Sequence, residues 1–146
     1  MKKTPLYEKH VALNAKIIDF GGWAMPVQYT NVIDEHKATR GFSGLFDICH
    51  MGEFIFQGDF EAGGLEDVFT FSVKTIPVGR SRYGFLLNEQ GGIIDDLIVF
   101  RLAEEKVMIV VNAATAPKDF AAIKGRLRGG LFTDITAATG KLDIQG

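Results

Sequence analysis

Two apolar runs separated by a glycine-containing turn form the clearest hydrophobic pattern in this chain. Residues 81–87 end in the apolar run Phe85–Leu87, and a second apolar run covers residues 93–100. One face of the first run carries Tyr83, Phe85 and Leu87. Residues 88–92 include two adjacent glycines, which supply the positive φ angles that tight turns require. The pattern therefore predicts an antiparallel hairpin.

The second strand of this hairpin carries two adjacent carboxylates inside an otherwise apolar run. Because strand side chains alternate, Asp96 shares a face with Ile94 and Ile98, while Asp95 points to the opposite face. A carboxylate among apolar neighbours needs a partner, a proton or a ligand. The pattern alone leaves two interpretations open, which are a chemical role for these acids or a position in solvent at a sheet edge.

Towards the N-terminus the pattern predicts two helices joined by irregular chain. Thr4 is expected to cap the first helix, and Asn31 to cap a second helix that Gly41 ends. Residues 17–29 and 42–50 show no clear period, so we expect loops there.

From residue 51 onwards the expected order is strand, helix, three strands, helix and strand. The first helix covers residues 61–69, weakened by two glycines, and the second begins at a cap on Thr115. The expected strands are residues 51–58, 81–87, 93–100, 107–112 and 131–135, with residues 141–145 as a further short candidate. This order predicts an α+β fold with a ferredoxin-like, split β-α-β arrangement on an antiparallel sheet.

The chain of 146 residues is long enough to bury a real core, and we expect three segments within it. Residues 1–50 form an N-terminal segment and residues 51–136 form the α+β unit. Residues 53–58 and 141–146 share an apolar alternation that ends in Gln-Gly. This echo predicts that residues 137–146 begin a second, truncated unit of the same kind.

Composition narrows the function classes. The formal net charge of -2, with scattered basic residues, excludes a strongly basic nucleic-acid footprint. No apolar stretch is long enough to span a membrane, and the single cysteine, Cys49, is expected to be a small buried residue in a reducing compartment. His10 is expected to be a packed or surface histidine, because no second ligand lies at metal-site spacing. We therefore expect a cytoplasmic protein without a metal site.

Five stretches, in order along the chain, resemble the aminomethyltransferase, or T-protein, family of the glycine cleavage system. They are Thr4–Leu6, Gly22–Tyr29, Gly44–Glu53, Gly91–Val99 and Val110–Ala114. They are spread over nearly the whole chain, although the resemblance extends over only the first part of family members. The chain departs from the family pattern at Phe100, where tyrosine is frequent, and at Thr115, where asparagine is common.

The resemblance implies a tetrahydrofolate-dependent aminomethyltransferase that takes its one-carbon unit from the lipoyl arm of H-protein and releases ammonia. By the family pattern Asp96 lies beside the pterin as the catalytic residue, and Asp95 on the opposite face is structural. The matching folate-binding positions are Met51, Tyr83, Asp96, Ile98 and Asn112. The chain would then be an incomplete part of the folate-binding fold, with residues 1–50 as its N-terminal segment.

The resemblance leaves several functions open. The chain is either the N-terminal part of an aminomethyltransferase, completed by a missing C-terminal portion or a second chain, or a non-catalytic folate-binding or interaction module. Folate-dependent demethylases and transfer-RNA-modifying enzymes share the scaffold, so the fold alone does not name the one-carbon donor.

Overall fold

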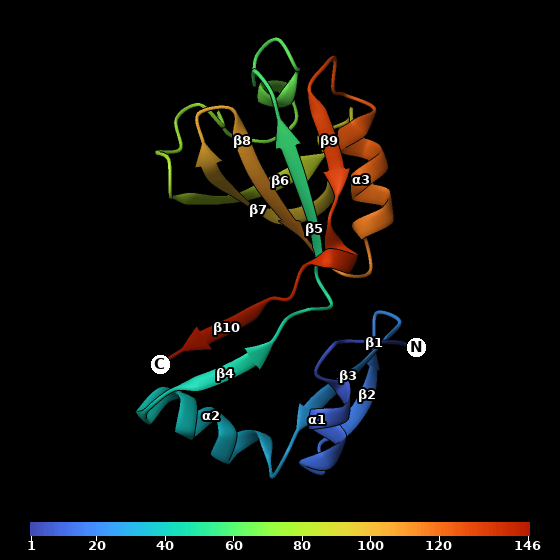
Figure 1. Cartoon of the computed structure of the whole chain (residues 1–146), viewed down its shortest axis with the longest axis vertical. Helices are drawn as coiled ribbons and strands as arrows, with labels where there is room; N and C mark the ends of the chain where they lie inside the picture. The colour runs from blue at the N-terminus through green and yellow to red at the C-terminus, as the bar shows by residue number, and fades with distance from the viewer. The chain divides into compact units, whose positions relative to one another are not determined.

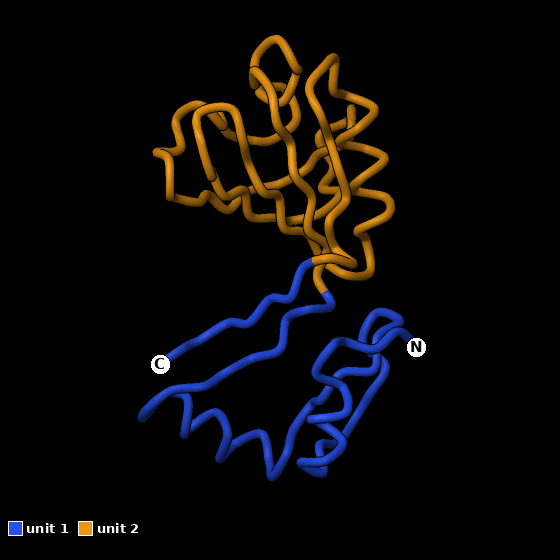
Figure 2. Tube along the Cα trace, in the orientation of Figure 1, with its two compact units in different colours: residues 1–50, 139–146 blue, residues 51–138 orange.

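The computed structural model describes residues 1–146, which form two compact units (Figure 2). Unit 1 consists of residues 1–50 and 139–146, and unit 2 of residues 51–138. The division into domains at residues 1–50, 51–136 and 137–146 stays a prediction. No helix of the chain combines the length and the apolar character needed to cross a membrane.

Unit 2 is a 5-stranded sheet in which every neighbouring pair is antiparallel, with the strand order β6-β7-β8-β5-β9 (Figure 1). Its strands are β5 (Gly52–Gln57), β6 (Ser81–Leu87), β7 (Ile93–Ala103), β8 (Lys106–Val111) and β9 (Leu131–Asp134). Helix α3 (Ala116–Lys124) connects β8 to β9, and β5 lies between those two strands. This is a split β-α-β arrangement, so the predicted α+β fold class is confirmed.

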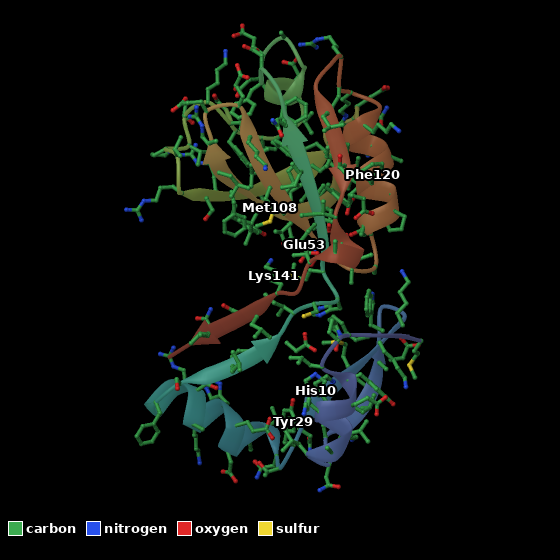
Figure 3. The ribbon with its side chains drawn as sticks, viewed as in Figure 1. His10, Tyr29, Glu53, Met108, Phe120 and Lys141 are labelled. Atoms are coloured by element: carbon green, nitrogen blue, oxygen red, sulfur yellow. The ribbon has the colours of Figure 1, made fainter.

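The hydrophobic core lies on one face of the unit 2 sheet, against α3. Alternate residues of β7 divide between the faces, so that Leu97 and Val99 are buried in the core and Ile98 points to the other face. Phe120 of α3, which Figure 3 labels, contributes to the packing of this unit. Its ring stacks on that of Phe132 of β9, with ring centroids 4.7 Å apart. The opposite face of β7 carries the side chains of Ile98 and of the residues two positions away from it, including Asp96.

The helix predicted for residues 61–69 is wrong. Only a short 3-10 turn, η1 (Leu65–Asp67), forms there, because Gly64 has a φ of 82° that a right-handed helix does not accommodate. Leu65 and Val68 are nevertheless buried in the core. The apolar residues of this segment therefore pack into the core although their backbone is irregular.

The hairpin of β6 and β7 forms as its pattern predicts. The side chain of Asn88 accepts hydrogen bonds from the backbone nitrogens of Gln90 and Gly92 at 3.0 and 2.8 Å. Of the two glycines only Gly91 has a positive φ, of 80°, so one glycine and the Asn88 side chain together make the turn.

Unit 1 contains two small sheets and two helices. Its elements are β1 (Lys2–Lys3), α1 (Tyr7–Ala12), β2 (Lys16–Phe20), β3 (Trp23–Gln28), α2 (Val32–Gly41), β4 (Gly44–Asp47) and β10 (Leu142–Gln145). One sheet has the order β1-β3-β2, and the other pairs β10 with β4. The turn η2 (Thr136–Ala138) ends unit 2 just before β10.

Several expectations for unit 1 are corrected by the structure. The loop predicted for residues 17–29 is the β2–β3 hairpin, turned by Gly21 and Gly22 with φ angles of 59° and 85°. The irregular segment predicted for residues 42–50 contains β4, which pairs with the distant β10. Thr4 does not cap α1, whose N-cap is Leu6 without a side-chain hydrogen bond.

The predicted cap of α2 is confirmed. Asn31 has extended backbone angles, and its side chain accepts a hydrogen bond from the backbone nitrogen of Asp34 at 2.9 Å. Asp34 and Glu35 in the first turn place negative charge at the positive end of the helix dipole.

Gly130, just before β9, provides a test of core packing. Its φ is 81°, and an added Cβ would lie 2.6 Å from the ring of the fully buried Phe56. We expect Gly130→Ala to lower the free energy of unfolding by about 2–3 kcal/mol, measured by urea denaturation. Gly79→Ala is the matched control, because Gly79 also has a φ of 81° but nothing within 4 Å of the added Cβ. Equal losses in the two variants would contradict the steric argument.

Candidate functional site

Asp96 joins two neighbouring strands through its side chain. The hydroxyl of Tyr83 on β6 donates to Asp96 Oδ2 at 3.2 Å, and the side-chain amide of Asn112 donates to Asp96 Oδ1 at 3.2 Å. Ile98 pairs with Tyr83 across the β6–β7 ladder, so these side chains share one face of the sheet. Tyr83 is 58% exposed, which leaves this cluster open to solvent.

Tyr83 is held in its neutral form by these neighbours. Desolvation of the hydroxyl, its hydrogen bond to Asp96 and the negative charges of Asp96 and Asp95 raise the pKa of Tyr83 above its ordinary value. A neutral phenol is a hydrogen-bond donor, and its ring provides an apolar surface beside the carboxylate.

Met51 lies at the end of the sheet where Asn112 is found. Gly52, the first residue of β5, pairs with Val111, the last residue of β8. Met51 directly precedes Gly52, and Asn112 directly follows Val111. The structure thus joins Tyr83, Asp96 and Asn112 by hydrogen bonds, sets Ile98 opposite Tyr83, and places Met51 at the neighbouring strand end.

Asp95 is buried and paired, so the interpretation of solvent-facing acids at a sheet edge is wrong for this residue. It is 7% exposed and lies on β7, an interior strand of the sheet. It accepts hydrogen bonds from the backbone and side-chain nitrogens of Asn112 at 3.1 and 2.9 Å, and from the Thr115 hydroxyl at 2.8 Å. Burial alone would raise the pKa of Asp95, but these hydrogen bonds outweigh it and hold the pKa below its ordinary value.

The hydroxyl of Thr115 therefore serves Asp95 rather than the helix. Thr115 occupies the N-cap position of α3, but it has helical backbone angles and its side chain makes no cap hydrogen bond. The predicted side-chain cap is wrong, because Asp95 Oδ2 at 2.8 Å is a charged acceptor and draws the hydroxyl to it.

Asp119 is a buried acid that the sequence pattern did not single out. It lies on α3 with 0% exposure, and neither carboxyl oxygen has a hydrogen-bond partner of ordinary geometry. Burial first, and then the neighbouring carboxyl of Asp95, raise the pKa of Asp119 to about 7. Asp119 lies four positions before Ile123, so both residues are on the buried face of α3. An acid at a position of that apolar face is the sequence signal that could have revealed it.

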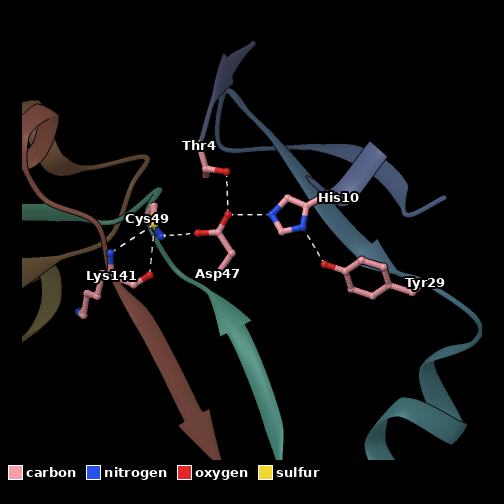
Figure 4. Close-up of polar contacts among 6 residues, drawn as sticks. All are labelled: Thr4, His10, Tyr29, Asp47, Cys49 and Lys141. Carbon is pink, nitrogen blue, oxygen red and sulfur yellow. Dashed lines mark hydrogen bonds and ion pairs between the residues drawn. The ribbon is translucent and has the colours of Figure 1, made fainter. Parts of the chain in front are cut away.

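Unit 1 contains a separate polar network around the side chain of Asp47 (Figure 4). Asp47 Oδ2 accepts from the Thr4 hydroxyl at 2.6 Å and lies 2.8 Å from His10 Nε2, while His10 Nδ1 lies 2.7 Å from the Tyr29 hydroxyl. His10 is 5% exposed, so of the two expected positions, packed or at the surface, it takes the packed one. The network ties β4 to the chain ahead of α1 and to the end of β3.

A cavity of about 590 Å³ lies in the same unit. Most of the side chains that line it are apolar, and Tyr29, Asp47 and His50 are among the polar groups in its wall. Burial lowers the pKa of His50 below its ordinary value. Cys49 is buried, as expected, and its sulfur donates to the backbone oxygen of Lys141 at 3.3 Å. The hydrogen bond of Cys49 joins the segment after β4 to the segment before β10, so the role of this cysteine is structural.

The fold and the cluster on its sheet define an α+β domain with a polar site, in which a carboxylate, an amide and a phenol meet on one face. Residues 6–146 match the family model described as GCVT N-terminal domain. The chain belongs to this family, as the resemblance of its motifs predicts. Its α+β fold matches the corresponding part of a solved aminomethyltransferase structure.

Relatives named as aminomethyltransferases and a solved structure agree with this assignment. Over the whole chain, an aminomethyltransferase of Thermus thermophilus is 41% identical, and the match covers 42% of that protein. The aminomethyltransferase of Thermotoga neapolitana is 46% identical over 124 residues, which are 85% of this chain and 34% of that protein. The crystal structure of glycine cleavage system aminomethyltransferase T from Bartonella henselae superposes with a TM-score of 0.93 at 40% identity, covering 99% of this chain and 40% of that one. The chain thus spans less than half the length of these relatives.

Proposed function

We propose that this chain is the N-terminal, folate-binding part of an aminomethyltransferase that moves a one-carbon unit from the lipoyl arm of H-protein to tetrahydrofolate. The observation that supports the proposal most directly is the hydrogen-bonded cluster of Tyr83, Asp96 and Asn112. The relatives that match the chain are named aminomethyltransferases. A region equivalent to the remainder of those relatives, in the same chain or a second one, would complete the enzyme.

The proposed reaction transfers one carbon atom between two pairs of heteroatoms. Two nitrogens of tetrahydrofolate form bonds to the aminomethyl carbon, whose bonds to the amino nitrogen and to the lipoyl sulfur break. The two displaced N–H protons end on ammonia and on the lipoyl thiol. A carboxylate beside the attacking nitrogen can accept its hydrogen bond and help to move its proton, which is the role we assign to Asp96.

The neighbouring side chains have binding roles in this proposal. Tyr83 provides an aromatic wall for the pterin, with its hydroxyl directed at Asp96. Asn112 offers its carbonyl oxygen as an acceptor to a pterin edge, because its amide nitrogen already donates to Asp95 and Asp96. Ile98, across the ladder from Tyr83, and Met51 provide apolar contact beside the ring.

Asp96→Asn tests the catalytic role. The chain would be joined to the part of the Thermus thermophilus aminomethyltransferase that follows the matched region, and ammonia release would be measured with aminomethylated H-protein and tetrahydrofolate. We expect Asp96→Asn to lower the rate by at least about 100-fold, because asparagine keeps the shape but cannot accept a proton. Glu89→Gln is the control, because Glu89 is exposed in the hairpin turn.

The same assay distinguishes the alternative functions. If the joined protein binds tetrahydrofolate but never releases ammonia, the chain is a non-catalytic folate-binding module. Turnover with a methylated amine, and none with H-protein, would identify a folate-dependent demethylase instead. Equal rates for Asp96→Asn and Glu89→Gln would remove Asp96 from the reaction.

A further inference from the structure

Asn112 is held in one amide orientation by the acids around it. Its Nδ2 lies 2.9 Å from Asp95 Oδ1, and 3.2 Å from both the backbone oxygen and Oδ1 of Asp96. Three oxygens around one atom require that atom to be the donor nitrogen. The carbonyl oxygen of the amide is therefore turned away from the acids, where it can accept a hydrogen bond from an N–H group of a ligand.

Asp95 fixes this orientation, and it is itself surrounded by donors on the core side of the sheet. Both of its oxygens accept from Asn112, and Oδ2 also accepts from Thr115. The remaining polar side chain within its reach is Asp119, which influences the ionisation of Asp95. Two ionised carboxyls cannot share a buried site without strong repulsion, so one of the pair must retain a proton.

Asp119 is the member of the pair that the structure equips to retain the proton. It has 0% exposure, and both oxygens lack a hydrogen-bond partner of ordinary geometry, whereas Asp95 has three donors. The charged groups that act on Asp119 are Asp95 on β7 and Lys118 on α3 itself. A protonated Asp119 can donate to Asp95, while an ionised one repels it.

We propose that the buried pair Asp95–Asp119 is a positioning device, in which the proton on Asp119 keeps Asp95 in place and so fixes the amide of Asn112 with its carbonyl oxygen towards the ligand site. Loss of that proton drives the two carboxyls apart and releases the amide. The pair thereby links the orientation of a binding side chain to pH. The positioning itself depends only on this chain, and its use for an N–H-bearing ligand rests on the proposed function.

Burial and the adjacent Asp95 place the titration of Asp119 near neutral pH. They raise the pKa of Asp119 to about 7, while Thr115 and Lys118 act in the opposite direction. The amide is therefore expected to be fixed below this pH and loosened above it.

The test follows the side-chain amide of Asn112 by nitrogen–proton correlation NMR of the whole chain between about pH 5 and pH 9. The wild-type amide resonances are expected to shift with a midpoint near the pKa of Asp119, and Asn112→Ser assigns them by their loss. Asp119→Asn, whose amide can still donate to Asp95, is expected to abolish the shift and keep the low-pH position. Glu89→Gln should leave the titration unchanged. A shift that survives Asp119→Asn overturns the inference.

A second measurement covers the case in which Asp119→Asn fails to fold. The carboxyl carbon of Asp119 in the wild-type chain should titrate together with the Asn112 amide. Titration of Asp119 at the ordinary pKa of an aspartate, about 4, would overturn the inference without any variant. Tetrahydrofolate is added only afterwards. Its failure to bind would count against the proposed function, whereas the two NMR titrations decide the positioning role by themselves.

Discussion

Asp47→Ala should lower the free energy of unfolding of unit 1 by about 3–5 kcal/mol. The Asp47 side chain is 1% exposed and accepts hydrogen bonds from the Thr4 hydroxyl, from the backbone nitrogen of Cys49 and from His10 Nε2, which lies 2.8 Å away. Alanine would leave the buried Thr4 and His10 without their acceptor. Burying unsatisfied polar groups costs more than the lost hydrogen bonds are worth.

Trp23 makes this prediction straightforward to measure. It is the only tryptophan of the chain and lies at the start of β3, so its fluorescence during urea denaturation reports on unit 1. Glu8→Ala is the control, because the ion pair of Glu8 with Lys3 is exposed and at 3.4 Å is worth about 0.5 kcal/mol or less. A loss for Asp47→Ala no larger than that of Glu8→Ala would show that the network contributes little.

The same residue gives unit 1 a pH dependence on the acid side. Burial opposes the ionisation of Asp47, but hydrogen bonds from Cys49, His10 and Thr4 outweigh it and lower the pKa of Asp47 to about 2. Because the folded pKa lies below the unfolded one, this stabilisation is present above about pH 4 and is lost as the pH falls towards about 2. The loss amounts to about 2 kcal/mol, and Asp47→Ala should not show it.

Asp119→Asn should remove a fall in the stability of unit 2 that the wild-type chain shows as the pH rises from about 4 to about 7. The pKa of Asp119 is raised to about 7 in the folded chain, from an ordinary value of 3.8. A raised pKa stabilises the fold below the unfolded pKa, and this contribution is lost as the pH rises through the folded one. The full span corresponds to about 4 kcal/mol, and asparagine has no proton to lose.

Urea denaturation at several pH values, followed by NMR signals of Ile109 and Ile123 in the unit 2 core, measures this slope. The wild-type chain and Glu89→Gln should lose stability in parallel across the window, while Asp119→Asn stays level. An unchanged slope in Asp119→Asn would assign the pH dependence to other groups. Asp95 does not produce it, because its lowered pKa acts below the ordinary range of an aspartate.

The elements that could be predicted are those whose signals are local. The β6–β7 hairpin follows from alternation within residues 81–100 and from Asn88 in its turn. The strand β4 could not be predicted in the same way, because its partner β10 lies far along the chain and its own residues show no clear period. The predicted helix at residues 61–69 failed for a local reason, since the left-handed backbone of Gly64 overrides the apolar spacing around it.

In the candidate site, too, the features with a local sequence signal could be predicted and the others could not. Strand alternation separates Asp95 from Asp96, and the structure bears this out by burying one against α3 residues and leaving the other beside the exposed Tyr83. The choice of Asp96, Tyr83 and Asn112 as a group came from the resemblance to a family and not from periodicity. Asp119 was missed because the inward stripe of its helix was recognised by apolar residues alone, and an acid that retains its proton can occupy such a stripe.

The division of unit 1 into two stretches of sequence has a consequence for how the protein is made. Cys49 and its partner Lys141 are separated by 92 positions, with the whole of unit 2 between them. At a translation rate of about 5–20 residues per second, β4 leaves the ribosome several seconds before β10 exists. During that interval the backbone groups of β4 lack their partner strand, and unit 2 has time to fold first. Chaperone dependence during synthesis should therefore concentrate on the first 50 residues.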